Sequence, residues 1–281
     1  MARCSIVNVS DILDLEPHGP DTFVGTGPQY PWGGLYGGQI VAQALQAATE
    51  TVDGEFAAHS LRAYFIRRGD HDEPVRYEVD RIRNGRSFCT RRVVARQSIG
   101  AILNLEASFQ VPEDTADVET VSFPLDVPRA DELPDTSWTP MFGRCFVPAS
   151  RLEASGRSGQ GRVAAWLRVR EDLSARPDLH RGGLAYLSDD LPTDAVVRAH
   201  PLGREPEELL HQVVFTASLD HTIWFHRPLR ADRWHLYDFS CQTYVASRGL
   251  SIGHVFDEDG SHVATVAQEV LLRDSRDRRA P

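Results

Sequence analysis

The fold is decided by the stretch Gly33-Gly-Leu-Tyr-Gly-Gly-Gln-Ile-Val-Ala-Gln-Ala-Leu-Gln-Ala-Ala-Thr-Glu50. Its first half is broken by glycines, and its second half has apolar residues at helical spacing. These residues share one helical stripe: Ile40, Val41, Ala44, Leu45 and Ala48. The sequence therefore predicts a largely buried helix after the glycines.

Extended segments lie on both sides of this helix in the sequence. A short apolar run at Phe23–Val24 precedes it, and no second helix follows it for some sixty residues. In one of the following segments, Val75, Tyr77 and Val79 alternate with polar residues, which is typical of a strand with one buried face. The strands predicted after the helix are Ala58–Arg67, Pro74–Arg83, Ser87–Gln97 and Ala101–Val111. The first half thus has the order β-α-β-β-β-β.

The same order recurs in the second half. Residues Arg162–Arg170 alternate as a strand does, Ala185–Ala199 contains a shorter helical candidate, and Asp257–Gly260 has the composition of a hairpin turn. The strands predicted after that helix are Val213–His226, Trp234–Ser240, Ser251–Phe256 and Val263–Leu272. The repeat is one of element order and not of residue identity.

Residues 113–140 separate the two copies. This segment combines acidic residues with Pro124, Pro128, Pro134 and Pro140, so it cannot continue a central strand. We interpret it as a linker that runs over the surface. The predicted organisation is a first lobe at residues 1–112, the linker at 113–140, a second lobe at 141–273 and a charged tail at 274–281.

A lone helix followed by antiparallel strands needs a sheet that curls around it, because each buries the apolar face of the other. That is the hot-dog arrangement. We therefore expect an α+β chain, a tandem double hot-dog in which each lobe is a curled antiparallel sheet wrapped around a central helix. The two lobes would pack side by side. Their exposed faces could pair again in a homo-oligomer, but no residue specifies a dimer, tetramer or monomer.

Composition narrows the classes of function. The formal net charge of −10 disfavours a nucleic-acid surface. No segment approaches about 18 apolar residues and the N-terminus has no signal-peptide pattern, so neither membrane insertion nor export is expected. The four cysteines have no CxxC spacing and no histidine partner at metal-ligand spacing. This predicts no metal and no disulfide framework, and it fits the cytoplasm.

Motifs follow one another in a fixed order in both lobes. Those of the first lobe are Gly37–Leu45, His59–Asp70, Arg83–Ala95 and Ala107–Gln110, and those of the second are Tyr186–Asp189, Ala217–His221, Trp224–Pro228, Ser247–Gly249 and Val266–Glu269. Together they closely resemble the acyl-CoA thioesterase II family. In that family a water is activated by an aspartate at the start of the second lobe's helix, a Thr or Ser on the next strand and a glutamine on the last strand. The resemblance assigns these roles to Asp189, Ser218 and Gln268, although a slip of one residue would exchange Asp189 with Asp190.

Strand periodicity singles out Gln268 independently. It shares one strand face with Ala264, Val266, Val270 and Leu272, so a single amide interrupts an apolar row. A buried amide needs hydrogen-bond partners, and a neighbouring backbone group would serve as well as a catalytic water. The last strand of the first lobe has no amide on its apolar face, which comprises Leu103, Leu105, Ala107 and Phe109. This difference predicts one working site, in the second lobe.

Asp189 and Ser218 also have plainer interpretations. Asp189 lies in Ser188-Asp-Asp-Leu-Pro192, where a helix N-cap belongs, and an N-cap aspartate usually accepts the first free N–H groups. The same helix end could instead stabilise the oxyanion that forms when water adds to a thioester. Ser218 shares strand parity with Asp220 and Thr222, which by itself indicates a half-buried strand hydroxyl.

The resemblance implies hydrolysis of fatty acyl-CoA to free fatty acid and CoA by direct attack of an activated water, with Asp189 as general base and no cofactor. The chain has no GxSxG elbow, which argues against an α/β-hydrolase serine nucleophile. Two alternatives stay open. A hot-dog hydratase or dehydratase would need a histidine with an acidic partner near a lobe's helix, and a non-catalytic acyl-CoA-binding protein would release no thiol.

Other residue groups carry less information. The glycines at 33–38 match neither GxGxxG nor a Walker motif, and close helix–sheet packing explains them better. The acyl length is not indicated, and no histidine among His221, His226, His235, His254 and His262 stands out. Eight arginines are candidates for contacts to the CoA phosphates: Arg67, Arg68, Arg83, Arg86, Arg91, Arg92, Arg227 and Arg248.

Overall fold

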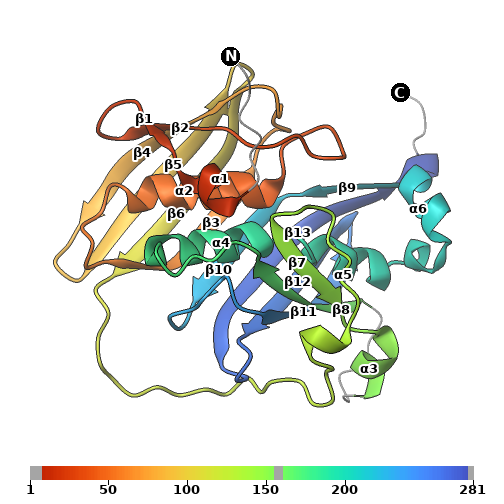
Figure 1. Cartoon of the computed structure of the whole chain (residues 1–281). Helices are drawn as coiled ribbons and strands as arrows, with labels where there is room; N and C mark the ends of the chain where they lie inside the picture. Colours follow the sequence, from red (N-terminus) through yellow and green to blue (C-terminus); the bar gives the residue numbers. More distant parts are fainter. Residues whose placement is uncertain (1–7, 155–160, 278–281) are drawn as a thin grey trace.

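The computed structural model describes residues 8–154 and 161–277. In its first half one long helix is followed by four strands, in the predicted order (Figure 1). The elements of this half are α1 (Val9–Leu13), β1 (Glu16–Pro17), β2 (Thr22–Gly25), α2 (Gly37–Thr49), β3 (Ala57–Phe65), β4 (Val75–Asn84), β5 (Phe88–Gln97) and β6 (Gly100–Gln110).

Helix α2 is the predicted buried helix. Its apolar stripe packs against the inner face of β2 to β6, and nearly every residue from Gly38 to Ala48 is buried. Its buried glutamines have partners, as buried amides must. The hydroxyl of Tyr77 donates to Oε1 of Gln43 at 2.7 Å, and Nε2 of Gln43 donates to the carbonyl of Ile12 at 2.8 Å.

The second half contains more elements than the sequence predicts. Strand β7 and three of its helices have no counterpart in the predicted pattern. The elements are β7 (Phe142–Phe146), α3 (Ala149–Ala154), β8 (Arg162–Val169), α4 (His180–Leu187), α5 (Pro192–Ala199), α6 (Glu207–Val213), β9 (Val214–Ser218), β10 (Asp220–Phe225), β11 (His235–Val245), β12 (Arg248–Phe256) and β13 (His262–Asp274). Short 3-10 turns lie at Ala130–Glu132, Pro177–Leu179, Pro201–Arg204 and Ser275–Asp277.

The single helix predicted within Ala185–Ala199 is wrong, because the chain forms two helices there. Helix α4 ends at Leu187, and α5 begins at Pro192, whose fixed φ suits the first helical position. Helix α5 packs inside the sheet of the second half, against β8, β11, β12 and β13. Helix α4 lies against α2 of the first half, so the break between the two helices faces the boundary between the lobes (Figure 1).

The predicted strand Val213–His226 is also two elements. Strands β9 and β10 both pair with β13, and Leu219 interrupts the strand between them. The N–H of Leu219 donates to the carbonyl of Glu269 at 2.9 Å. Strands β11 and β12 extend further than predicted, to a tight turn. The turn residues Ala246 and Ser247 have φ angles of 50° and 63°, a left-handed conformation that glycine usually adopts. Because neither residue is a glycine, the sequence did not indicate this turn.

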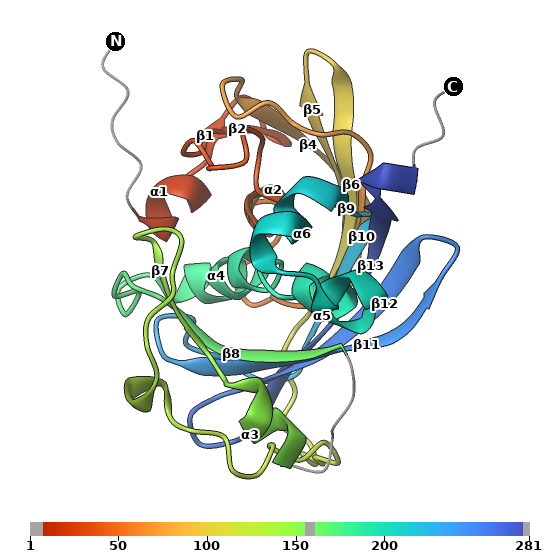
Figure 2. The ribbon, with the colours of Figure 1, turned by 90° about the vertical axis from the view of Figure 1, so that its right-hand side faces the viewer.

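The two lobes share one antiparallel sheet. Its strand order is β1-β2-β4-β5-β6-β3-β10-β13-β12-β11-β8-β7, with β9 beside β13. Strand β3 of the first lobe pairs directly with β10 of the second, from Ser60 opposite Trp224 to Tyr64 opposite Asp220. Figure 2 shows this sheet curving around α2, α4 and α5. The tandem hot-dog prediction is confirmed, and the lobes join edge to edge.

The segment between the lobes has no strand before β7. Residues 112–120 are exposed, and then the side chains of Val121, Phe123 and Val127 pack over a small apolar cluster beneath β8, β11 and β12. Nε1 of Trp166 donates to the carbonyl of Pro128 at 2.8 Å. The lobe boundaries at 112, 140 and 273 stay predictions. Residues 278–281 of the predicted tail lie outside the described residues.

Across the two described ranges, no helix combines the length and the apolar character needed to cross a membrane.

Candidate active site

Asp189 lies in the turn between α4 and α5. The alternative interpretation of Asp189 as a helix N-cap does not hold, because Ser188 is the C-cap residue of α4 and Leu191 is the N-cap residue of α5. Its side chain therefore does not serve its own helix. It is partly exposed, and it points toward the first lobe, as its neighbours below indicate.

The N-terminus of α2 meets this carboxylate. A Cβ on Gly37 would lie 2.6 Å from Oδ2 of Asp189, and a Cβ on Gly38 would lie 2.3 Å from the carbonyl oxygen of Tyr186. These glycines therefore allow α2 to approach α4 and Asp189, and Gly37 also allows the predicted close helix–sheet packing, because its Cβ would lie 3.0 Å from the ring of Phe65 on β3. No side chain caps α2, and hydrogen bonding from the Gly38 backbone lowers the pKa of Asp189. The site predicted in the second lobe takes its helix end from the first.

Gln268 and Ser218 lie beside Asp189. The side chain of Gln268 is fully buried on β13, on the predicted apolar face, and its Nε2 donates to Oγ of Ser218 at 2.8 Å. Hydrogen bonding by both side chains also lowers the pKa of the Asp189 carboxyl. The fold therefore brings the three predicted residues together from three separate segments.

Asp190 faces other partners. Nε1 of Trp138 donates to its Oδ1 at 2.7 Å, and Nη1 of Arg144 lies 3.1 Å from its Oδ2. In contrast, Oδ1 of Asp189 is buried and has no hydrogen-bond partner among the described residues. Asp190 is thus held in an ion pair, whereas Asp189 keeps an oxygen that can accept a proton.

Burial dominates the electrostatics of Asp189. It raises the pKa of this carboxyl to about 7, with a smaller contribution from the charge of Asp190. The hydrogen bonds from Gln268, the Gly38 backbone and Ser218 act in the opposite direction, since they favour the ionised form and lower the pKa. Burial also raises the pKa of Asp190, against the lowering effect of Arg144. Asp189 can therefore gain and lose a proton near neutral pH.

His221 belongs to this site, although the sequence analysis did not prefer it over the other histidines. Its ring is fully buried, with Nδ1 2.5 Å from Oε1 of Gln268 and Nε2 2.8 Å from Oγ of Ser188. One signal was present in the sequence. His221 alternates with the buried Ile223 and Phe225 on β10, so a polar ring interrupts this apolar face as Gln268 does on β13.

An aromatic cluster adjoins the carboxylates. It is formed by the loop before α2, the end of the linker, the start of β7 and α4, and its members are Tyr30, Trp32, Tyr36, Trp138, Phe142 and Tyr186. The hydroxyl of Tyr36 is buried and has no partner within residues 8–154 and 161–277. Burial, followed by the charges of Asp189 and Asp190, holds the pKa of Tyr36 well above its ordinary value, so the hydroxyl stays protonated.

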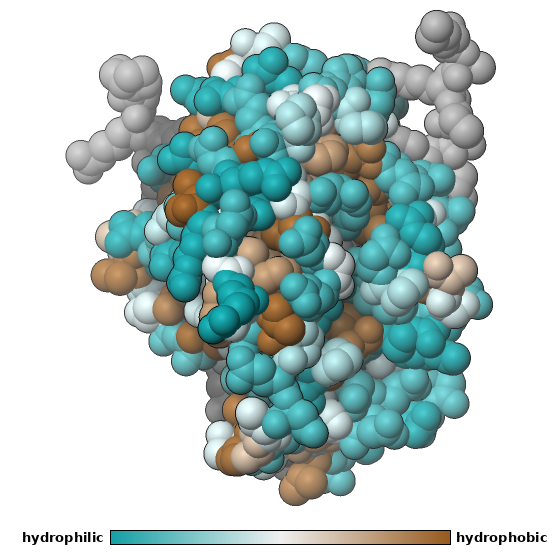
Figure 3. Space-filling view, turned by 90° about the vertical axis from the view of Figure 1, so that its left-hand side faces the viewer, coloured by the Kyte–Doolittle hydropathy of each residue, from teal (hydrophilic) through white to brown (hydrophobic). Residues whose placement is uncertain are grey.

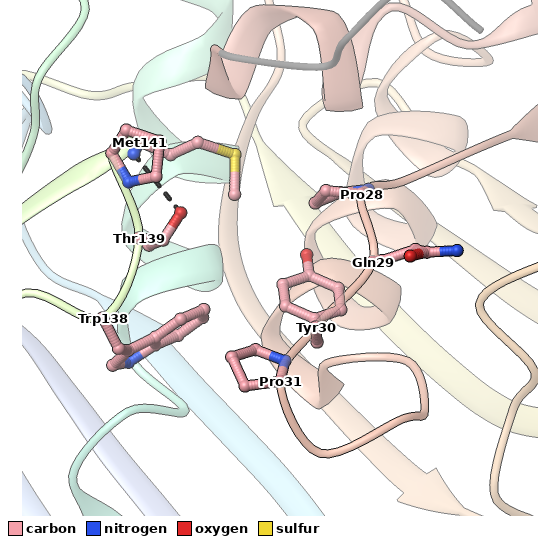
Figure 4. Close-up of a pocket in the computed structure, with 8 residues that line it drawn as sticks. Pro28, Gln29, Tyr30, Pro31, Trp138, Thr139 and Met141 are labelled. Atoms are coloured by element: carbon pink, nitrogen blue, oxygen red, sulfur yellow. Dashed lines mark hydrogen bonds between the residues drawn. The ribbon is translucent and has the colours of Figure 1, made fainter.

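A pocket of about 160 Å³ opens beside this cluster, between residues 28–31 and 138–141. In Figure 4 the rings of Tyr30 and Pro31 lie across this pocket from Trp138, and the backbone N–H of Met141 donates to Oγ1 of Thr139. The face of the molecule in Figure 3 is mostly hydrophilic, with hydrophobic residues gathered near its centre. The side chain of Trp32, a member of the aromatic cluster, is 45% exposed.

Several candidate arginines have internal partners. Arg91 is buried and donates to Thr51, and Arg68 donates to the carbonyls of Trp32 and Gly33. Arg227 pairs with Asp117 and Glu119, and Arg248 pairs with Glu269. No group of three or more metal-binding side chains suited to an ion occurs in the described part of the chain.

The chain matches two models of known families along most of its length. Residues 27–110 match the acyl-CoA thioesterase N-terminal domain, and residues 115–272 match the acyl-CoA thioesterase C-terminal domain. It is similar to acyl-coenzyme A thioesterase 8 from Homo sapiens, with 33% identity over 95% of this chain and 89% of that protein.

Solved structures give the same result. The acyl-CoA thioesterase II TesB2 from Mycobacterium marinum superposes with a TM-score of 0.82 and 33% identity, covering 97% of this chain and 99% of that one. A hot-dog protein of unknown function from Alicyclobacillus acidocaldarius superposes with a TM-score of 0.76 over 97% and 98% of the two chains. At 20% identity, this second likeness supports the fold alone.

Proposed function

Because the chain belongs to the acyl-CoA thioesterase II family, we propose that Asp189 is the general base that activates water for hydrolysis of the acyl-CoA thioester. The observation that carries the proposal is the buried Oδ1 of Asp189, which no described residue uses. It lies beside two side chains that can orient a water, Gln268 and Ser218. A base whose pKa is close to the working pH is well matched to proton transfer.

The reaction then proceeds without an acyl-enzyme. A water bound at Oδ1 of Asp189, beside Gln268 and Ser218, gives a proton to this carboxylate as its oxygen adds to the thioester carbonyl carbon. The positive dipole end at the start of α2 stabilises the negative charge that develops on the carbonyl oxygen. When the tetrahedral intermediate collapses, the carbon–sulfur bond breaks and Asp189 returns the proton to the CoA thiolate. The products are the free acid and CoA.

We place the acyl chain against the aromatic cluster. The rings of Tyr36, Trp138 and Tyr186 adjoin the two aspartates, and apolar walls with a few polar groups are typical of a small-molecule site. The cytoplasm remains the proposed compartment, in keeping with the free thiols of Cys89 and Cys145.

Replacement of Gln268 by alanine tests the site. Loss of one preorganised polar group at such a site costs about 100- to 1000-fold in kcat, and we expect Gln268→Ala to fall in this range with its circular dichroism spectrum unchanged. The readout is steady release of free thiol from acyl-CoA substrates of several chain lengths. Gln97→Ala is the matched control, because Gln97 is a buried glutamine bonded to the Asp70 backbone, away from this site.

Near-native turnover of Gln268→Ala would remove this residue from the mechanism. The same assay on the unmodified protein addresses the two alternatives. A non-catalytic binder would retain acyl-CoA and release no thiol, and a hydratase would consume an unsaturated acyl-CoA without releasing thiol.

A further inference from the structure

His221 connects the two segments that the proposed mechanism uses. Its Nδ1 lies 2.5 Å from Oε1 of Gln268 on β13, and its Nε2 lies 2.8 Å from Oγ of Ser188. Ser188 is the residue directly before Asp189 and ends α4. All three side chains are fully buried, so no solvent competes for these contacts. One ring thus joins the strand that carries the amide to the turn that carries the base.

The carboxylate determines the direction of every hydrogen bond in this chain of contacts. An ionised Asp189 can only accept, so the hydroxyl of Ser218 gives its hydrogen to Asp189 and must accept from another group. That group is Nε2 of Gln268, at 2.8 Å. The other end of the amide, Oε1, is an acceptor and faces His221. The ring must therefore carry a hydrogen on Nδ1.

The ring is neutral in this position. Burial lowers the pKa of His221 to about 4, although the bond to Gln268 acts in the opposite direction. A neutral ring with its hydrogen on Nδ1 has a lone pair on Nε2, which can accept the hydroxyl hydrogen of Ser188 at 2.8 Å; the carbonyl of Ala185, 3.0 Å from the same hydroxyl, is the other acceptor within reach of that hydrogen. The donors then run in one direction, from Ser188 through His221, Gln268 and Ser218 to Asp189.

We propose that His221 is a positioning residue, whose Nδ1–H holds the Gln268 amide in the one orientation that points its N–H groups at Ser218 and Asp189. This inference rests on the proposed role of Asp189 as the base. Without the ring donor, the amide can rotate by half a turn and present its oxygen to the carboxylate. Asp189 would then lose a donor and face a partial negative charge, and its affinity for a proton would rise.

The test compares His221→Phe with His221→Asn. Phenylalanine keeps a planar ring and removes the donor, whereas the asparagine amide nitrogen can take the place of Nδ1. We expect His221→Phe to lower kcat by about 100-fold, the effect of misplacing a reacting group by about an ångström, while KM stays within about twofold. The pH at which kcat is half-maximal should rise, because the donors that favour ionised Asp189 are lost. His221→Asn should restore the pH midpoint and most of kcat.

The control is His235→Phe. His235 is buried and bonded to the backbone carbonyl of Arg233, outside this chain of contacts, so its loss should leave the pH midpoint in place. A purely structural role for His221 would lower activity without moving that midpoint and without rescue by asparagine, and either result overturns the proposal. Asp189→Asn is measured alongside. If Asp189→Asn keeps its turnover, the proposed mechanism itself fails, whatever the histidine variants do.

A second measurement needs no variant. Nitrogen-15 NMR of the histidines in the unmodified protein should show His221 as a neutral ring with its hydrogen on Nδ1 from about pH 5 to about pH 9. A ring that carries its hydrogen on Nε2, or that titrates in this range, would overturn the assignment.

Discussion

At the scale of single residues, the site depends on a balance at Asp189. Removal from water disfavours its charge, and donors from Gln268, Ser218 and the Gly38 backbone favour it. The net result is a pKa of about 7 on a carboxylate that still has one oxygen without a hydrogen-bond partner among the described residues. Asp190, which is held by Trp138 and Arg144, does not have both of these properties. The catalytic proposal and the pH behaviour of the protein both follow from this balance.

The rate should depend on pH through Asp189. A general base must be ionised, and the pKa of Asp189 is about 7, so we expect kcat to be low in acid, to rise through about pH 7 and to level off above it. The measurement is the kcat profile for thiol release, with a reporter whose response is corrected for pH. A profile that is flat between about pH 5 and pH 9 would contradict this role for Asp189.

The same carboxyl should reduce stability at high pH. Its folded-state pKa of about 7 exceeds the ordinary value of 3.8, so the folded protein binds this proton more tightly than the unfolded chain does. The free energy of unfolding therefore decreases as pH rises from about 4 through about 7, by at most about 4 kcal/mol. Asp189→Asn should be stabilising at about pH 8 and nearly neutral at about pH 4 in urea unfolding.

Asp190→Asn is the matched control for that measurement. Asp190 is the charge partner of the largely buried Arg144, so its replacement leaves that guanidinium without its carboxylate and should destabilise the protein at about pH 8. Destabilisation by Asp189→Asn at the same pH would contradict the raised pKa.

At the scale of elements, the site depends on how closely α2 approaches α4. Glycine allows this approach at the first turn of α2, because a side chain on Gly38 would collide with the Tyr186 backbone at 2.3 Å. The positive helix end then lies against the carboxylate of the other lobe. The buried faces of β13 and β10 add the amide of Gln268 and the imidazole of His221 to the site.

Gly38→Ala should therefore damage both stability and turnover. The backbone oxygen it meets cannot move without moving α4, and overpacking of this kind costs about 1–3 kcal/mol. We expect a lower Tm and a fall in kcat, measured by thermal unfolding and thiol release. The control is Gly54→Ala, since nothing lies within 4 Å of a Cβ at Gly54. Equal behaviour of the two variants would show that the close approach has no consequence.

At the scale of the whole molecule, the lobes are not separable units. The β3–β10 ladder continues the sheet across them, and one apolar core contains residues from both, among them Leu45, Leu61, Ile223 and Tyr186. The proposed base, Asp189, comes from one lobe and the helix end beside it from the other. Activity therefore requires the lobes to stay docked.

Unfolding should accordingly be a single event. With a shared sheet and core, tryptophan fluorescence and far-ultraviolet circular dichroism should give coincident denaturation curves with one transition. Trp32 of the first lobe and Trp166 of the second report on both halves. Two separated transitions would indicate that each lobe has its own stability.

The sequence by itself determined most of the local structure of the first lobe. The helix at residues 37–49, the four strands after it and the buried face of the last strand all follow from periodicity, because burial on one side of an element repeats along the chain. Resemblance supplied Asp189, Ser218 and Gln268 as candidates. The family and the thioesterase reaction were predicted correctly, and the lobe boundaries stay predictions.

Only the tertiary structure decided how these residues meet. No local pattern states that Gly37 approaches Asp189, that Arg144 and Trp138 engage Asp190, or that His221 reaches both Ser188 and Gln268. Periodicity reports which face is buried, but not which distant residue covers it. The site is assembled across the lobe boundary from segments far apart in sequence, so its geometry depends on the packing of α2 against α4 and on the register of β10 with β13.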